Sequence, residues 1–252
     1  MQIELAILSK RGGRSYNEDA CGHWHSDTHL CCVVADGAGG HGGGDKASRL
    51  AVGAVIEGFA AQPDLSGPSI EQLIRATNQN ILSHRGDDPS MAQMHSTVVS
   101  LFIDLDGNVA AWGHAGDSRL YAFRGGRIQT QTKDHSVVQG LVDSGLLQGD
   151  QMRTHAQRSE LVSALGLDDS DLLIDANGEP WAMRPGDVFL LCTDGLWEYV
   201  EEPALEAALQ AATDPHGWLD TLEQAVLRNA ANKPSHDNFS ALTVWVTEDP
   251  PA

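Results

Sequence analysis

Runs of apolar residues, several of them alternating with polar ones, recur along the chain and are typical of β-strands. Seven such runs predict strands at residues 2–7, 29–35, 96–104, 108–116, 119–123, 188–193 and 239–246. Two of the connections contain turn residues: Asp106-Gly107-Asn108 joins the third run to the fourth, and Gly125-Gly126 follows the fifth. Because short glycine-containing turns join antiparallel strands, the strands are predicted to form antiparallel sheets.

Helical periodicity appears between these runs, in two pairs of segments. The segments are residues 44–61, 69–84, 203–211 and 216–231. Ser69 is predicted to cap the second helix, and Pro215 to begin the fourth. Two blocks of strands, each with its own helix pair, predict an α+β fold: a four-layer αββα sandwich of two stacked antiparallel sheets flanked by helix pairs.

The length of 252 residues suits one domain, and we expect residues 1–252 to form it. The weak break at residues 61–69 fits a loop between two helices better than a domain boundary. Residues 135–165 carry short helical patterns without a strand, and are predicted to form a partly mobile insertion near the site.

Charge and cysteine content exclude several classes of protein. With 16 Lys or Arg against 35 Asp or Glu, the formal net charge is −19, which disfavours nucleic acid and anionic membrane surfaces as partners. No apolar run is long enough to span a membrane, and no signal peptide is indicated. The four cysteines show no CxxC spacing and are predicted to be reduced and mostly packed, as in a cytoplasmic protein.

Acidic residues at the ends of predicted strands are the most informative feature. They are Glu18-Asp19, Asp36, Asp117, Asp194 and Asp237. Each alone is explained by a turn or a helix cap. If they converge on one cleft, however, their repulsion would be strongly destabilising without divalent cations. Carboxylates and water favour Mg²⁺ or Mn²⁺ over Zn²⁺.

Seven short segments occur in the order and approximate spacing of the metal-dependent protein phosphatases, the type 2C serine/threonine phosphatases. They read RSYNED, VADGAGGHGGGDKAS, GDSRLYAFRGG, TKDHS, ALG, LLCTDGLW and DNFS. The resemblance covers about residues 5–247 and is strongest to the compact, stand-alone bacterial members. It implies the sandwich fold already predicted.

The resemblance also implies roles for individual residues in binding two Mn²⁺ or Mg²⁺ ions. Asp36 would bridge the two ions. The Gly37 carbonyl and, through water, Glu18 would complete the shell of one ion. Asp194 and Asp237 would bind the other.

Further roles follow from the same resemblance. Asp117 would hold a weaker third ion together with Asp194. Arg14 would grip the substrate phosphate, and Asp19 would support the metal-bound water. Residues 135–165 would correspond to a flap beside the cleft that affects substrate choice.

The sequence departs from the family pattern at two places. Animal relatives have a histidine, proposed as general acid, where this chain has Ala38. His41 matches a histidine of the bacterial motif, and we expect it to orient the glycine-rich loop. The flap reads HAQRS where many bacterial relatives have HPxxN, so their selectivity does not transfer.

His23, His25 and His29 are expected to be surface or strand residues around a hairpin, because no zinc-binding spacing includes them.

The resemblance implies an enzyme that hydrolyses phosphoserine and phosphothreonine in proteins, with a hydroxide bridging the two ions as nucleophile. Its substrates would be targets of a bacterial serine/threonine kinase, and compact members of this kind also occur with type VI secretion. Two alternatives stay open: a catalytically silent module that binds metal or phosphoproteins, and a phosphohydrolase of small phosphoesters. Because a silent module is free to lose any of Arg14, Asp36, Asp194 and Asp237, the presence of all four disfavours it.

Overall fold

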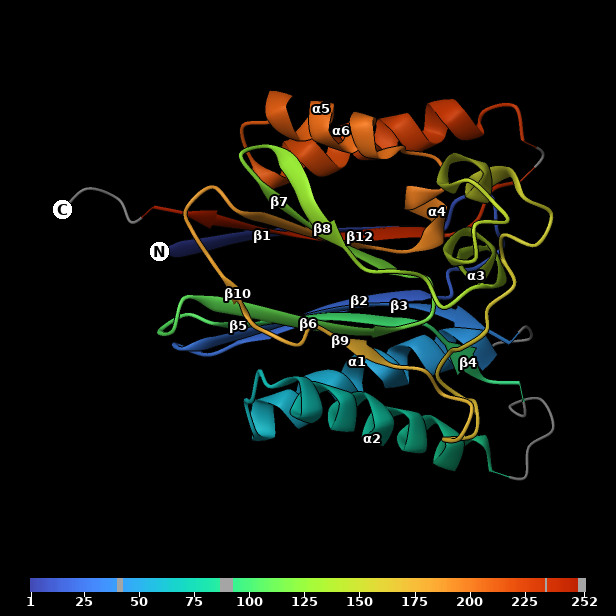
Figure 1. Ribbon diagram of the computed structural model, residues 1–252, viewed down its shortest axis with the longest axis horizontal. Coiled ribbons are helices and arrows are strands. Elements are labelled where there is room, and N and C mark those ends of the chain that lie inside the picture. The colour runs from blue at the N-terminus through green and yellow to red at the C-terminus, as the bar shows by residue number, and fades with distance from the viewer. Residues whose placement is uncertain (40–42, 87–92, 234, 249–252) are drawn as a thin grey trace.

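Two antiparallel sheets stack face to face and a pair of helices covers the outer face of each, as the computed structural model in Figure 1 shows. The structure describes residues 1–39, 43–86, 93–233 and 235–248. The predicted α+β sandwich of four layers is confirmed.

Sheet A has the strand order β1-β12-β11-β7-β8, and its longest pairing joins β1 to β12 over nine residues at the two ends of the chain. Its strands are β1 (Gln2–Lys10), β12 (Phe239–Thr247), β11 (Val188–Cys192), β7 (Arg119–Arg124) and β8 (Arg127–Gln131). The predicted turn at Gly125-Gly126 joins β7 to β8, with both glycines at positive φ (60° and 72°). Such φ values favour glycine and explain this tight turn.

Sheet B has the order β10-β6-β5-β3-β2, with β4 beside β3 and β9 beside β6. Its strands are β10 (Trp181–Ala182), β6 (Val109–Ala115), β5 (Val98–Asp104), β3 (His29–Ala38), β2 (Asp19–His25), β4 (His95–Ser96) and β9 (Asp175–Ala176). His23, His25 and His29 lie on the β2–β3 hairpin, as predicted.

The helix pairs are α1 (Gly43–Ala61) with α2 (Gly67–Arg85) on sheet B, and α5 (Glu202–Ala211) with α6 (Pro215–Ala230) on sheet A. Pro215 begins α6 as predicted. The prediction for Ser69 is wrong: α2 begins two residues earlier, after Ser66, and the Ser69 hydroxyl donates to Asp64 instead. The proline at the start of α2 is compatible with this earlier beginning, because a first-turn N–H needs no helical partner.

Three apolar layers hold the sandwich together. One lies between sheet A and its helices and includes Trp218 and Phe123. A second lies between sheet B and its helices, around Phe59 and Phe102. The third lies between the two sheets and contains both Cys32 and Leu242. All four cysteines are free and three are buried, as predicted.

The segment at residues 135–165, which we call the flap segment, contains α3 (Val137–Asp143) and the 3₁₀ helix η2 (Gly149–Thr154). It lies beside α4 (Asp194–Trp197), at the edge of the sandwich where the ends of several strands meet (Figure 1). None of the helices in the described part of the chain has the length and apolar character needed to cross a membrane.

Candidate active site

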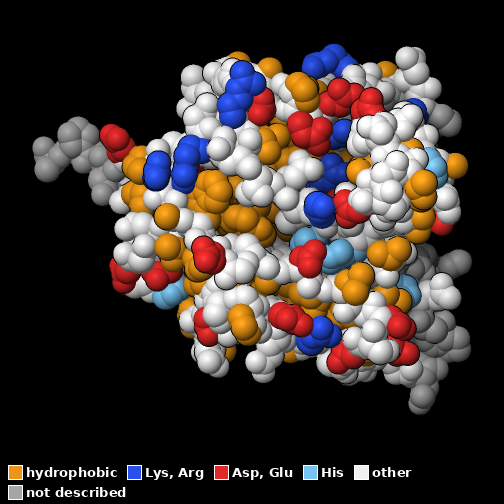
Figure 2. Space-filling view, in the orientation of Figure 1, with side chains coloured by type: hydrophobic (Ala, Val, Ile, Leu, Met, Phe, Trp, Pro, Cys, Tyr) orange, Lys and Arg blue, Asp and Glu red, His pale blue; other side chains and the backbone are white. Residues whose placement is uncertain are grey.

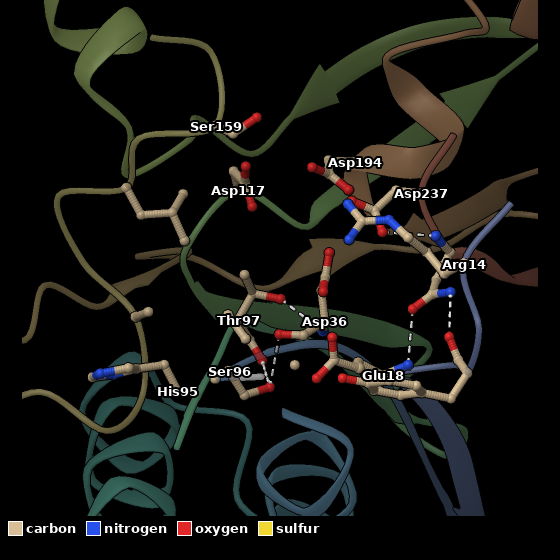
Figure 3. Close-up of a pocket in the computed structure, with 17 residues that line it drawn as sticks. Arg14, Glu18, Asp36, His95, Ser96, Thr97, Asp117, Ser159, Asp194 and Asp237 are labelled. Carbon is tan, nitrogen blue, oxygen red and sulfur yellow. Dashed lines mark hydrogen bonds and ion pairs between the residues drawn. The ribbon is translucent and has the colours of Figure 1, made fainter. Parts of the chain in front are cut away.

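A cavity of about 400 Å³ opens at this edge, between the two sheets and the flap segment. Seven of the eight predicted site residues line it: Arg14, Glu18, Asp36, Gly37, Asp117, Asp194 and Asp237. Figure 3 shows carboxylates of this set facing one another from different elements. On the face drawn in Figure 2, by contrast, acidic side chains are scattered over all the layers. The concentration of carboxylates in the cavity is therefore more than a reflection of the overall charge.

Strand pairing places Asp19 beside Asp36, which lines the cavity. Asp36 lies near the end of β3, and the register of the β2–β3 pair places Asp19 directly opposite it. Asp19 does not line the cavity but is buried behind it, where it accepts a hydrogen bond from the Thr193 hydroxyl at 3.0 Å. Thr97 fixes the backbone of Asp36: its hydroxyl accepts from the Asp36 N–H at 2.9 Å, and its N–H donates to the Asp36 carbonyl at 2.8 Å.

The remaining carboxylates come from sheet A and its connections. Asp194 is the first residue of α4, directly after β11. Asp237 precedes β12, and Asp117 lies buried in the connection from β6 to β7. Because β11 and β12 are antiparallel neighbours, the end of one and the start of the other share one edge. The sheet topology thus brings Asp194 and Asp237 to the same opening.

Several buried oxygens in this region have no hydrogen-bond partner in the described part of the chain. They are Glu18 Oε1, Asp19 Oδ1 and Asp194 Oδ1. A buried carboxylate oxygen without a partner is strongly unfavourable, so these atoms call for a cation or water. Hard divalent cations prefer such oxygens, and the residues present therefore fit Mn²⁺ or Mg²⁺.

Burial, and after it mutual repulsion, raises the pKa values of these carboxyls. Burial, and next to it the charge of Asp19, raises the pKa of Asp36 well above its ordinary range. Burial and the charge of Asp117 do the same to the pKa of Asp194. Burial raises the pKa of Asp19, and that of Asp117, from 3.8 to about 7. Nearby divalent cations would favour the charged forms and lower these values.

Glycine is required where the chain passes closest to the carboxylates. The Gly37 N–H donates to the Glu18 carbonyl at 3.1 Å. A Cβ at Gly37 would collide with the Gly44 carbonyl, and a Cβ at Gly44 would collide with Glu18 Oε1. The glycines of this loop therefore leave room for Glu18 and for the Gly37 carbonyl. His41, expected to orient the loop, lies outside the described residues.

Arg14 extends over the opening, with 53% of its side chain exposed (Figure 3). Its guanidinium forms an ion pair with Asp237 at 2.6 Å. This partner is a residue more than 220 positions away, which no local pattern could indicate.

Asn238 was assigned no role from the sequence, yet it organises the loop that carries Arg14. Its side-chain oxygen accepts from the Glu18 N–H at 2.8 Å, and its amide donates to the carbonyls of Arg11 and Tyr16 at 2.6 and 3.0 Å. The signal was present in the DNFS segment, because an asparagine directly after a candidate ligand can hold a neighbouring loop. Its partner loop became identifiable only in the fold.

A second group of metal-ligating residue types lies beside the cleft, at the base of the flap segment. His114, His135 and Asp175 each place a ligand atom within 4.8 Å of the others, the only such trio among the described residues. His135 Nδ1 accepts from the Gly116 N–H at 3.2 Å, so its proton lies on Nε2, 3.2 Å from Asp175 Oδ2. The two imidazole rings are stacked at 14°, so their in-plane lone pairs do not converge. These contacts favour a hydrogen-bonded cluster over a metal site.

Comparisons with known proteins agree with this geometry. The family model described as Protein phosphatase 2C matches residues 9–232. The serine/threonine protein phosphatase PstP of Mycobacterium tuberculosis is 32% identical over 211 residues, which are 82% of this chain and 39% of PstP. This chain therefore spans well under half the length of that relative. The serine/threonine phosphatase stp of Listeria monocytogenes is 28% identical over 237 residues, covering 92% of this chain and 90% of stp.

Solved structures show the same likeness across almost the whole chain. The PstP catalytic domain in complex with two manganese ions has a TM-score of 0.79 at 29% identity, covering 98% of this chain and 99% of that one. PppA, described as a key regulatory component of the type VI secretion system in Pseudomonas aeruginosa, has a TM-score of 0.75 at 30% identity, covering 97% and 98%.

Proposed function

The chain belongs to the protein phosphatase 2C family, and from this premise we propose that it hydrolyses phosphoserine and phosphothreonine in proteins with the help of bound Mn²⁺ or Mg²⁺. The observation that carries the proposal is the convergence of buried carboxylates, several with oxygens that lack a partner among the described residues, beneath an exposed arginine. Neither a structural turn nor a helix cap requires that arrangement.

Five positions would hold two ions. Asp36 lies centrally and would contact both. Gly37, through its carbonyl, and Glu18, through water, would serve one ion, while Asp194 and Asp237 would serve the other. When bound, the ions supply positive charge and a water of lowered pKa for attack on phosphorus. The PstP structure with two manganese ions supports the number and the kind of ions in this proposal.

The protein's own side chains would orient the reactants. Arg14 would release Asp237 and hold two non-bridging oxygens of the phosphate, because its planar fork matches their spacing. Asp19, held by the Thr193 hydroxyl, has Oδ1 without a partner in the described chain and would support the metal-bound water. Asp117, together with Asp194, would hold a weaker third ion.

The biological setting is part of the same proposal. The substrates would be proteins phosphorylated by a bacterial serine/threonine kinase, and the free, mostly buried cysteines suit the reducing cytoplasm. The likeness to PppA supports a role in regulating a type VI secretion system. Loss of a kinase-dependent phosphoprotein signal on adding the enzyme to extracts of the host, and its persistence with an inactive variant, would test this setting.

Turnover of a phosphothreonine peptide tests the activity. We expect Mn²⁺-dependent hydrolysis by the wild type and its loss in Asp36→Asn, because a neutral amide cannot bridge two cations. The fold should remain intact, since the substitution relieves like-charge repulsion. Asp104→Asn is the matched control: Asp104 also ends a strand, but its carboxylate accepts from the Gly107 N–H in a turn. Full activity in Asp36→Asn with normal Mn²⁺ stoichiometry would refute the role of Asp36 as a ligand of both ions.

The same assay separates the two alternatives. Binding of Mn²⁺ without turnover of any phosphoester would indicate a silent module. Faster turnover of a small aryl phosphate than of the peptide, compared as kcat/KM at equal Mn²⁺, would indicate a small-molecule phosphohydrolase.

A further inference from the structure

The flap segment is attached to the active site through Arg153, a residue of η2 whose side chain is only 15% exposed. Its Nε donates to the backbone carbonyl of Trp197 at 2.9 Å. Its terminal nitrogen donates to both carboxylate oxygens of Glu202, at 2.8 and 3.0 Å. One side chain of the flap segment therefore holds the end of α4 and the start of α5 together.

The helix that Arg153 holds also carries part of the site. Asp194 is the first residue of α4 and Trp197 is the last, so only one helical turn separates the cleft from the contact with Arg153. The Trp197 indole N–H donates to the backbone carbonyl of Asp117 at 2.9 Å. Trp197 is 1% exposed. A single rigid element thus links Arg153 to both Asp194 and Asp117.

A second arginine, Arg119, contacts the same element. Arg119 lies with its guanidinium carbon 3.6 Å from the centre of the Trp197 ring. It forms a buried two-point ion pair with Asp134, at 2.8 Å for each bond, and contacts Glu202 at 3.4 Å. Both arginines contact Glu202, but Arg153 donates to the Trp197 carbonyl, whereas Arg119 lies closer to the ring, at 3.6 Å against 5.9 Å for Arg153.

The lowered pKa of Glu202 is consistent with its ion pair with Arg153. Burial alone would raise the pKa of this carboxyl, but the hydrogen bonds and charge of Arg153, together with a backbone hydrogen bond and the charge of Arg119, outweigh it and hold the pKa below its ordinary value. The ion pair is therefore present at neutral pH. Arg158 also belongs to the flap segment. It forms an ion pair with the Glu198 carboxylate at 3.0 Å.

We propose that Arg153 is a positioning residue that fixes α4 so that Asp194 and Asp117 keep the spacing needed to hold the third, weaker cation. This inference rests on the proposed function, because it assumes that the cleft binds Mn²⁺. It makes the docking of the flap segment and the occupancy of that cation mutually dependent. Substrates that displace the flap segment would weaken the third ion, and the ion would favour the docked flap segment.

Calorimetric titration with Mn²⁺ of the wild type, Arg153→Ala and Arg153→Lys tests the proposal. Residues that orient metal ligands change affinity by about 10- to 100-fold. We expect Arg153→Ala to weaken the third Mn²⁺ by about tenfold while the two tight ions are unchanged. Lysine should restore part of this, since it can contact Glu202 but not span both acceptors. Arg127→Ala is the matched control: this exposed arginine pairs with Glu206 of α5, away from the cleft.

The outcomes separate the inference from the proposed function. Unchanged affinity for the third Mn²⁺ in Arg153→Ala, even with faster proteolysis of the flap segment, would show that Arg153 only attaches that segment, and would overturn the inference. A wild type that turns over the peptide but binds only two ions would also overturn it, while leaving the proposed function standing. If Arg153→Ala fails to fold, Glu202→Gln removes the charged partner and should weaken the third ion in the same direction; unchanged binding there would refute the proposal.

Discussion

Replacing Asp19 by asparagine should stabilise the metal-free protein at pH 8. Asp19 is 9% exposed, and burial raises its pKa from 3.8 to about 7. A carboxyl whose folded-state pKa is raised contributes most to stability below its unfolded pKa, and that contribution is lost as the pH rises through about 7. In the absence of cations, the charged Asp19 therefore opposes folding at pH 8.

The size of the effect follows from the two pKa values. Each pKa unit corresponds to about 1.4 kcal/mol, so the change from 3.8 to about 7 amounts to about 4 kcal/mol at pH 8. The amide keeps the bond from Thr193, but its NH₂ group replaces an oxygen without a partner and costs about 1–2 kcal/mol. The expected net gain is about 2–3 kcal/mol, or about 5–10 °C in Tm for a chain of this length. At pH 5 the ionisation contribution falls below about 2 kcal/mol, because Asp19 is already protonated in the folded protein.

Thermal melts in EDTA at pH 5 and pH 8 measure this difference, and saturating Mn²⁺ at pH 8 should remove it. Asp187→Asn is the matched control with the opposite sign. Asp187 is 1% exposed, and although burial raises its pKa, hydrogen bonds from Arg124 at 2.7 Å, from the Trp181 indole and from the Arg184 N–H, with the charge of Arg124, lower it overall. Its loss should destabilise the protein at pH 8. An Asp19→Asn protein that melts below the wild type at pH 8, or a Tm difference that does not change with pH, would refute the reasoning.

Two further predictions concern binding and turnover. Arg14→Ala should keep its bound metals and lose at most about 1 kcal/mol of stability, because the ion pair between Arg14 and Asp237 is half-exposed. Its kcat/KM should nevertheless fall by about 10- to 1000-fold, and Arg14→Lys should recover only part of that loss. Steady-state kinetics and melts decide this: a large loss of Tm with unchanged kcat/KM of the folded fraction would contradict a phosphate-binding role. Asp117→Ala should retain two tightly bound ions and turn over peptide more slowly, because it removes a ligand of the third ion. Peptide turnover and an Mn²⁺ activation curve that both match the wild type would exclude that role.

The local pattern of the chain predicted most elements but missed those whose pattern is weak. Residues 239–246, rich in β-branched and aromatic side chains, are β12, as predicted. Residues 19–25 were given no strand of their own, beyond a hairpin expected around His23 and His25, because DACGHWH has little alternation and a central glycine, yet they form β2. The polar RIQTQ segment was missed likewise and forms β8 at the edge of sheet A. Pairing with a neighbouring strand decided both, and propensity did not.

The sequence by itself determined the kinds of residue available for chemistry: carboxylates at the ends of buried strands, glycines beside one of them, and an arginine nearby. The resemblance of the surrounding motifs to the type 2C phosphatases was sufficient to nominate Asp36, Asp194 and Asp237 for one cleft. It was not sufficient to place Asp19 opposite Asp36 or to pair Arg14 with Asp237. Those contacts depend on strand register and on the stacking of two sheets, to which residues hundreds of positions apart contribute.

The contact between Arg153 and α4 is the clearest case of a feature that only the tertiary structure decided. Arg153, Trp197 and Glu202 have no common periodicity or motif, and 49 residues separate Arg153 from Glu202. Hydrophobic periodicity encodes which face of an element is buried, because burial acts on each element separately. Which buried polar groups meet depends on how whole elements pack, since each such group must find a partner that the fold alone brings within reach.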